Sequence, residues 1–392
     1  MKTRLMTVAA LLASTVSAHA VGLDRSGQPV GILFQQGNHA ELSFGFTKPS
    51  LSGAELIGTS TGNVGDNFRV WSGGVKVDLG EKWSFSLSTD EPYGADTFYE
   101  GDPATTLLGG VGATVDSYAV TALARYKFND NWSVHGGLRY QEVSAVVTID
   151  GLAFNDQPGG APAGIGSYEG RFGSDGDVGA VIGASYEIPA IALRVSLTYS
   201  TSTTHDLPTS EVFVPNVIAL GGDFPLGTQR SVAGATTEVE TPESINLDFQ
   251  TGIAPNTLLF GTLRWADYDT TEVAPDVFSS PTAVGAPLTD LETGFDFSIG
   301  VGRRFNEKWS GSVSAGFTTV GDDSLVSPLG PNNGSRFIAV GAKYDVNESF
   351  AVAGGVRYTL LGSATAAPGD EPAAEFEDAS ALSAGLRFEY KF

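Results

Sequence analysis

The residues able to do acid–base or nucleophilic chemistry are few in this chain and lie far apart. Cysteine is absent, which excludes disulfides, thiolate metal sites and cysteine nucleophiles. His39, His135 and His205 fall on separate segments, and no serine-hydrolase elbow, zinc-binding helix motif or nucleotide-binding loop is present. The sequence therefore predicts no catalytic residue, no metal site and no cofactor, and we do not expect an enzyme.

Basic residues that could hold an acidic ligand recur at alternate positions of short segments, opposite an apolar face. Arg139, Arg194 and Arg357 are the clearest examples. Two interpretations stay open for them. They could brace the inside of a protein wall in ion-pair networks, or one or two of them could bind the carboxylate of an amphiphile. On either interpretation, strands must position them.

Composition narrows the class of protein further. The chain has 392 residues, 50 of them Gly, and 45 Asp and Glu against 22 Lys and Arg give a net charge of −23. This balance excludes nucleic acid as a partner, because phosphate binding needs a basic surface. A mean hydropathy of +0.01 is too polar for a bundle of membrane helices, and the apolar content is too high for a disordered chain. A β-rich globule or a membrane barrel remains.

The N-terminus has the pattern of a secretory signal peptide. Lys2 and Arg4 are followed by a mostly apolar run over residues 6–16, and Ala18-His19-Ala20 has the form of a cleavage site. The run is too short to span a membrane. We expect residues 1–20 to be a signal peptide, residues 21–38 to be a short N-terminal plug segment, and residues 39–392 to form the barrel.

From residue 39 onward, apolar and polar residues alternate with period two. Over residues 381–392, for example, Leu386 and Phe388 share one face, and Arg387 and Glu389 share the other. The pattern predicts fourteen strands, at 39–50, 67–80, 83–90, 116–129, 132–149, 174–188, 191–204, 236–250, 256–269, 294–305, 308–320, 335–345, 348–361 and 381–392.

Short and long connections alternate between these strands, which is typical of bacterial outer-membrane barrels with the short turns in the periplasm. Aromatic residues such as Trp83, Trp132 and Trp309 follow the short turns, where an interfacial girdle belongs. A soluble β-sandwich, the alternative, would not need so strict an alternation. We therefore predict an all-β, transmembrane antiparallel β-barrel of about fourteen strands, in the outer membrane of a Gram-negative bacterium. Its inner face would also carry Arg125, Lys343 and Arg387, whereas the side of Arg264 is ambiguous.

Two of the predicted long loops stand out. The loop predicted at 205–235 contains an apolar run, Val212, Phe213, Val214, Val217, Ile218 and Leu220 among its residues. It could pack on itself over the barrel mouth or form a surface that captures a hydrophobic ligand. The loop predicted at 90–115 is acidic, and such charge either keeps it solvated or binds anionic head groups of lipid or lipopolysaccharide through divalent cations.

Several stretches resemble the FadL/TodX family of outer-membrane hydrocarbon and fatty acid transporters. They are GNHAELSFG at 37–45, TPESINL at 241–247 and NTLLFGTLRW at 256–265. The resemblance implies passive uptake of long-chain fatty acids or other hydrocarbons, with release through a kinked strand in the wall. It also implies a gating hatch in the N-terminal segment, for which Gln28, Pro29, Val30 and Gly31 are the nearest match. The family's Asn-Pro-Ala element is replaced there at its first and third positions.

Two other functions compete with this interpretation. A general diffusion porin for small polar solutes would share the girdles and loops but would have a wide, conducting lumen. An outer-membrane lipase would need His39 or His135 in a catalytic role. We expect a monomer that binds a hydrophobic or amphiphilic small molecule, captured at the apolar run 212–220 and passed into the barrel.

Overall fold

The computed structural model describes residues 23–155, 165–215, 230–281, 283–289, 291–319, 321 and 324–392. The predicted signal peptide, residues 1–20, lies outside these ranges. Within them, no helix is long and apolar enough to cross a membrane.

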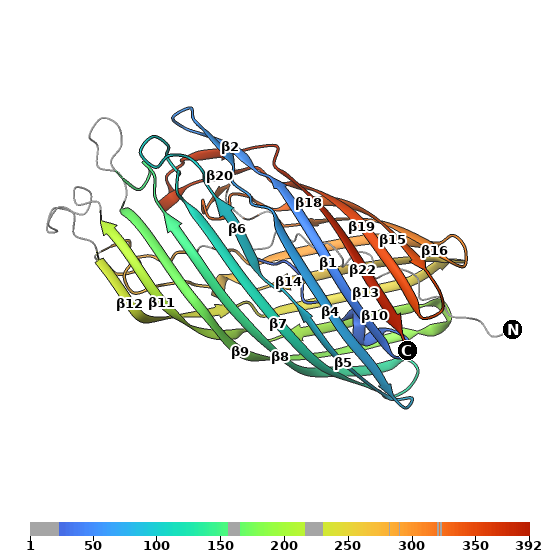
Figure 1. The fold of residues 1–392 in the computed structure, drawn as a ribbon. Helices are drawn as coiled ribbons and strands as arrows, with labels where there is room; N and C mark the ends of the chain where they lie inside the picture. Colours follow the sequence, from blue (N-terminus) through green and yellow to red (C-terminus); the bar gives the residue numbers. More distant parts are fainter. Residues whose placement is uncertain are drawn as a thin grey trace.

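The wall is a closed antiparallel barrel of 14 strand positions, tilted against the long axis of the molecule (Figure 1). Three positions consist of two consecutive strands: β5 with β6, β10 with β11, and β12 with β13. The ring closes where β1 pairs with β22 on one side and β4 on the other. The wall strands are β1 (His39–Ser50), β4 (Phe68–Leu79), β5 (Trp83–Asp90), β6 (Gly94–Phe98), β7 (Gly112–Lys127), β8 (Trp132–Ile149), β9 (Gly166–Ile188), β10 (Leu193–Ser200), β11 (Thr203–Pro215), β12 (Arg230–Thr241), β13 (Ser244–Ala254), β14 (Thr257–Ala266), β15 (Gly294–Arg304), β16 (Trp309–Thr318), β18 (Ser335–Asp345), β19 (Phe350–Leu361) and β22 (Ser380–Lys391).

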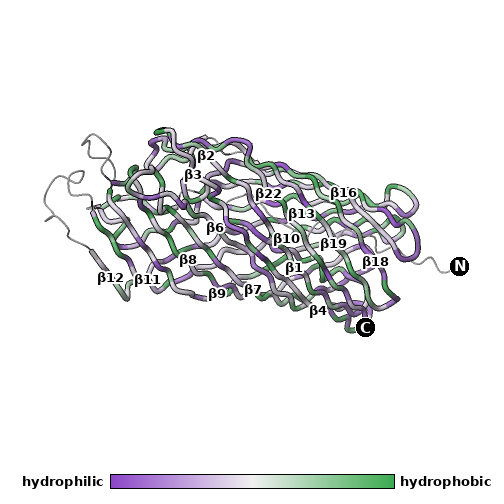
Figure 2. Tube along the Cα trace, turned by 45° about the horizontal axis from the view of Figure 1, so that its top comes forward, coloured by the Kyte–Doolittle hydropathy of each residue, from purple (hydrophilic) through white to green (hydrophobic). Residues whose placement is uncertain are grey.

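The predicted alternation of faces is confirmed. On β22, Leu386 and Phe388 are exposed on the outer surface, whereas Ser383 and Arg387 are buried towards the lumen. Figure 2 shows the same alternation of hydrophobic and hydrophilic residues along many strands. The outer face can therefore contact lipid, and the inner face supplies polar partners for whatever lies inside.

Asparagine residues build three of the short turns in the same way. The side-chain oxygens of Asn129, Asn306 and Asn347 each accept backbone N–H groups from the residues two and three positions ahead, at 2.8–2.9 Å. Each turn thereby starts the next strand on an aromatic residue. Ring pairs then link neighbouring strands along this rim, with centroids 4.8 Å apart: Trp83–Tyr126, Trp132–Tyr186 and Trp309–Tyr344. The predicted girdle is confirmed.

The end with the long connections is covered by a second, smaller sheet and by an apolar core. The sheet contains β2 (Ser52–Glu55), β3 (Ser60–Asn63), β17 (Leu325–Val326), β20 (Ala364–Ala366) and β21 (Ala374–Phe376). Leu108, Phe213, Phe278 and Phe376 belong to the core beneath it. Four short 3₁₀ helices complete the described elements: η2 (Gly31–Phe34), η3 (Pro189–Ile191), η4 (Tyr268–Thr270) and η5 (Pro368–Asp370).

Two of the predicted long loops contain wall strands. Most of the described part of 205–235 belongs to β11 and β12, and 90–115 contains β6 and the start of β7. On β11 the outward residues Asp206 and Ser210 are polar, so this part of the strand lacks the apolar outer face that marks a membrane span. The acidic residues Asp90 and Asp96 lie in β5 and β6 and not in a solvated loop.

Candidate functional site

A cavity of about 380 Å³ lies inside the barrel, in the half nearer the long connections. Its side wall is mostly apolar because inward positions of several strands carry aliphatic or aromatic residues at this level. These residues include Leu51, Val147, Phe172, Leu207 and Val239, and the last four lie on β8, β9, β11 and β12. All five are buried. The wall can therefore surround a non-polar molecule without competing hydrogen bonds.

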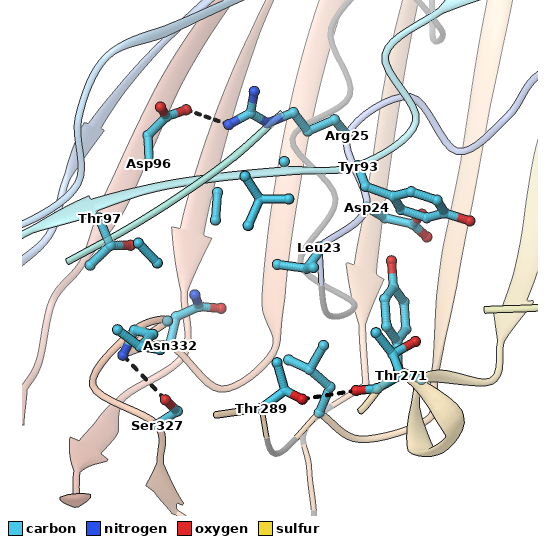
Figure 3. Close-up of a pocket in the computed structure, with 18 of the residues that line it drawn as sticks. Leu23, Asp24, Arg25, Tyr93, Asp96, Thr97, Thr271, Thr289, Ser327 and Asn332 are labelled. Atoms are coloured by element: carbon cyan, nitrogen blue, oxygen red, sulfur yellow. Dashed lines mark hydrogen bonds and ion pairs between the residues drawn. The ribbon is translucent and has the colours of Figure 1, made fainter. Parts of the chain in front are cut away.

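On the side nearer the long-connection end of the barrel, the cavity is lined by connections between wall strands. Val273, Leu288 and Leu329 line this side, and the hydroxyl of Thr289 donates a hydrogen bond of 3.0 Å to the carbonyl oxygen of Thr271 (Figure 3). The buried carboxylate of Glu211 on β11 accepts the N–H groups of residues 277 and 278 at 3.0–3.1 Å. The connection 271–289 is thus tied to the wall by charge-assisted hydrogen bonds.

The N-terminal segment forms the floor, where Leu23, Asp24 and Arg25 line the cavity. Asp24 makes a two-point ion pair with Arg264 of β14, with Nε–Oδ2 at 2.6 Å and Nη2–Oδ1 at 3.0 Å. The two side chains are 0% and 3% exposed. Arg264 also donates to the side-chain oxygen of Asn246 at 3.0 Å. The side of Arg264 that the sequence left open is the lumen.

Tyr93 and Tyr268 stand beside this ion pair, with ring centroids 6.4 Å apart in an edge-to-face arrangement. Burial and the neighbouring Asp24 carboxylate raise the pKa of the Tyr268 hydroxyl well above its ordinary value. The phenol therefore stays neutral at pH 7.

The predicted hatch residues lie in the N-terminal segment just beyond this floor. Gln28 adopts a positive φ of 53°, donates a hydrogen bond of 2.8 Å to the Tyr93 hydroxyl and accepts one of 3.2 Å from Ser244. Val30 is buried in a small cluster with Leu33, Phe34, Leu123 and Val181. Pro29 is exposed and Gly31 begins η2. A gating role for these four residues stays a prediction.

The lower part of the segment is held by basic residues of the wall. The Phe34 ring lies 4.6 Å from the guanidinium of Arg125 and 4.6 Å from that of Arg194. Lys76 donates to the backbone oxygens of Gln35 and Gly37, both at 3.0 Å. Cation–π contacts and charge-assisted hydrogen bonds thus anchor the segment towards the short-turn end of the barrel.

The wall is interrupted beside the cavity floor, between β5 and β6. The β4–β5 register ends at Gly73 opposite Thr89, and β6 pairs with β7 but has no described ladder to β4. Residues 92–94 pair instead with the N-terminal segment, through Arg25 N–H to Pro92 O and Gly94 N–H to Leu23 O, both 2.8 Å. The third wall strand is therefore bent towards the lumen at this point.

Side chains cover both faces of this interruption. On the inner side, Arg25 forms an ion pair with Asp96 of β6 (Figure 3). Its guanidinium lies 4.4 Å from the ring of Phe68, which begins β4. On the outer side, Trp71 of β4 and Tyr118 of β7 stack with centroids 6.0 Å apart. The two rings bridge from β4 to β7 across the interrupted strand.

The arginines predicted to bind a carboxylate lie outside the cavity lining. Arg139 is buried and donates hydrogen bonds to Thr121 at 3.0 Å and Ser200 at 3.4 Å. Arg357 lies 3.8 Å from the Phe337 ring, and Arg194 lies against Phe34. These contacts agree with the bracing interpretation, and ligand binding by the three arginines stays a prediction.

The residues predicted to capture ligand divide into two groups. Val212, Phe213 and Val214 are described and lie on β11, where Phe213 is fully buried in the apolar core. Val217, Ile218 and Leu220 lie outside the described residues.

Sequence reasoning missed the floor and the position of the interruption, since the family resemblance implied a kinked wall strand without saying which one. Asp24 and Arg25 are the one acidic and the one basic residue between positions 21 and 38. That isolation was the available signal for buried ion pairs. Tyr93 lies within residues 90–115, which the sequence predicts to be a long loop. Among the described residues, no cluster of His, Asp or Glu is arranged to hold a metal ion.

Comparison with known proteins places this barrel in a family. Residues 36–391 match the outer membrane protein transport proteins described as OMPP1/FadL/TodX. The chain belongs to this family. It is therefore an outer-membrane transport protein, and a general porin is not favoured. No curated protein sequence matches the chain significantly.

Solved structures show the same fold at low sequence identity. A Pseudomonas aeruginosa FadL homologue is 13% identical, with a TM-score of 0.73 over 97% of both chains. The P. putida toluene transporter TodX is 12% identical over 91% of both chains, with a TM-score of 0.64. The Ralstonia pickettii toluene transporter TbuX is 12% identical over 97% of both chains, with a TM-score of 0.61.

Proposed function

We propose that the protein takes up small neutral hydrophobic compounds passively and binds them in the lumen cavity. The observation that carries the proposal is the apolar wall of that cavity, whose volume of about 380 Å³ is typical of a small-molecule site. Each methylene moved from water into such a site gains about 0.8 kcal/mol. Binding energy here therefore comes from non-polar surface.

The charges around the cavity favour a neutral ligand over an acid. Among the described lining residues, Asp24, Asp66, Asp96 and Glu292 are acidic and Arg25 is basic. Arg25 is already paired with Asp96. A carboxylate in the cavity would face net negative charge, without a free cation among the described lining residues. That two structural relatives are named toluene transporters agrees with this choice.

A long-chain fatty acid is the second candidate, and one observation favours it. The Nε atom of Arg194 is buried and has no hydrogen-bond partner among the described residues. Because Arg194 lies against Phe34, below the cavity floor, an acid would bind there with its chain extending upward only if the N-terminal segment moved. Arg139 and Arg357 are further candidates for the same role.

We infer a route from the same geometry. A compound captured near the apolar run 212–220 would enter the cavity, and residues 21–38 would keep it from passing straight through to the periplasm. The interruption between β5 and β6 lies next to the cavity, since Tyr93 and Asp96 line both. Release would follow sideways through this interruption, after Arg25 leaves Asp96 and the Trp71–Tyr118 pair separates.

Equilibrium binding of radiolabelled toluene and decanoate to the purified barrel tests the ligand class. We expect toluene to bind more tightly than decanoate, and Leu207→Asp to weaken toluene binding at least tenfold. Thr204→Asp is the matched control, because it adds the same charge to the same strand on the outer, exposed face. Equal effects of the two substitutions, or tighter binding of decanoate, would reject the neutral-ligand proposal.

A further inference from the structure

The outer surface of five adjacent wall strands has an unusual charge. On β4, β1, β22, β19 and β18, the outward charged residues are Arg69, Lys48 and Arg336, and all three are basic and exposed. The chain as a whole carries a net charge of −23. On β7 and β8, by contrast, outward positions carry Asp116 and Glu142. Outward basic residues also occur elsewhere, as at Arg171 of β9 and Arg303 of β15, but on these five strands no outward acidic residue accompanies them.

An apolar groove of about 770 Å³ crosses the outer wall on this same side. Cross-strand register explains its shape, because large outward residues are paired with small ones. Leu386 lies opposite Gly354, which lies opposite Ala342, and Phe46 lies opposite Ala384. The small residues form the floor, and the sides are formed by Phe44, Phe46, Leu386, Val340 and Val356.

Arg69 lines one end of this groove, directly opposite Phe46 in the register of β1 and β4. Lys48 is the next outward residue of β1 after Phe46, so it is a diagonal neighbour of Arg69, with Cα atoms about 7–8 Å apart. Neither side chain takes part in an ion pair or hydrogen bond with the described residues. From β4 to β18, the groove spans roughly 19 Å at the usual spacing of strands.

Lys48 and Arg69 lie at the height along the barrel where the head groups of membrane lipids are expected. On β1 the outward residues Leu42, Phe44 and Phe46 are apolar, and Lys48 is the first charged one on the way to the long connections. An apolar band about 25 Å tall is the usual lipid-facing zone of such barrels. Lys48 and Arg69 therefore stand at its extracellular edge, and the groove lies within it.

We propose that this groove and its two cations bind a phosphorylated glycolipid of the outer leaflet, namely lipopolysaccharide through its lipid A part. One acyl chain lies over Ala384 and Gly354, and a sugar phosphate is held by Arg69 and Lys48. A guanidinium can contact phosphate oxygens at two points, and a nearby ammonium adds a second charge. This inference does not depend on the proposed ligand of the lumen, because the groove is on the opposite face of the wall.

Native mass spectrometry of the full chain in neutral detergent, titrated with lipid A, tests the proposal. Because each basic residue at a lipid surface strengthens binding about fivefold, we expect Lys48→Gln with Arg69→Gln to weaken binding roughly 20- to 30-fold. Arg303→Gln is the matched control, since Arg303 is an exposed residue at the short-turn end of β15. Ala384→Leu, which fills the groove and keeps both cations, should also weaken binding.

Lipid A without its phosphates should bind the wild-type protein as weakly as intact lipid A binds the double variant. Unchanged affinity in the double variant, or an equal loss in Arg303→Gln, would overturn the proposal. So would equally tight binding of the dephosphorylated lipid. If phosphatidylglycerol bound as tightly as lipid A, head-group charge alone would explain binding and the glycolipid assignment would be wrong. Heat-dependent mobility on gels would verify that each variant is a folded barrel.

Discussion

Asp24→Asn offers the sharpest test of whether the N-terminal segment closes the lumen. The substitution removes the charge that faces Arg264 and keeps the size of the side chain. Both side chains are almost completely buried and the pair makes two hydrogen bonds, at 2.6 and 3.0 Å. Leaving one member of such a pair buried without its partner costs about 3–5 kcal/mol. The segment would then be held by the Arg25–Asp96 ion pair, the backbone hydrogen bonds to residues 92 and 94, and the contacts of Gln28, Phe34 and Lys76.

The detachment of the segment that this cost causes can be measured as an increase in conductance. A loss of about 3–5 kcal/mol raises the ratio of the detached to the docked segment by roughly a hundredfold to several thousandfold. In planar bilayers, wild-type channels should be almost silent, and Asp24→Asn should show frequent openings. Deletion of residues 24–35 should give the conductance of the permanently open barrel, which sets the upper limit. The wall itself keeps every strand pairing in both variants.

Asp24→Leu combined with Arg264→Met is the matched control, because apolar replacement of a buried ion pair is often neutral. We expect this double variant to be as quiet as the wild type. If Asp24→Asn and the deletion both conduct like the wild type, the segment does not close the lumen. If the wild type already conducts freely, the protein acts as an open pore.

Three further outcomes are expected. A tag inserted at Gly330 should bind antibody on intact cells and a tag at Asp130 should not, and the reverse would contradict the orientation. Leu386→Arg should cost about 2–4 kcal/mol of barrel stability near the bilayer midplane, measured by denaturant unfolding in lipid, and inward-facing Ser383→Arg should cost less. Phe213→Asp should slow uptake of labelled hydrocarbon because it buries a carboxylate in the apolar core under the mouth, and a wild-type rate would reject a role for this residue.

The membrane-spanning wall could be predicted from the sequence, because lipid on one side and polar partners on the other impose period two. Leu386 and Arg387 illustrate this directly. In the part of the wall above the membrane, the pattern of apolar outward and polar inward residues does not hold. On β11 the outward residues Asp206 and Ser210 contact water while inward Leu207 and Phe213 are buried, so no outer apolar stripe marks the strand.

The cavity is less predictable from the sequence than the wall strands are. Its floor depends on the ion pair between Asp24 and Arg264, which are 240 positions apart in the sequence. The residues around each of them do not indicate which residue the partner is. The interruption between β5 and β6 depends on Pro92 and Gly94 finding hydrogen bonds in the N-terminal segment and not in a neighbouring strand. Such pairings are decided by the closed barrel as a whole.

The seam between β1 and β22 has a consequence for where a plug can come from. The two strands pair without a break from His39–Lys391 to Ser50–Ser380, and Phe392 N–H reaches Asn38 O at 3.2 Å. The wall is a closed ring of strands in which the first strand, β1, is the neighbour of the last, β22. The N-terminal segment joins this ring at Asn38. An internal segment can reach the lumen from the rim only as a loop that returns to it. At Asn38 the chain before β1 turns inward, and residues 23–38 lie in the lumen, so a change in the length of this segment need not alter any strand pairing of the wall.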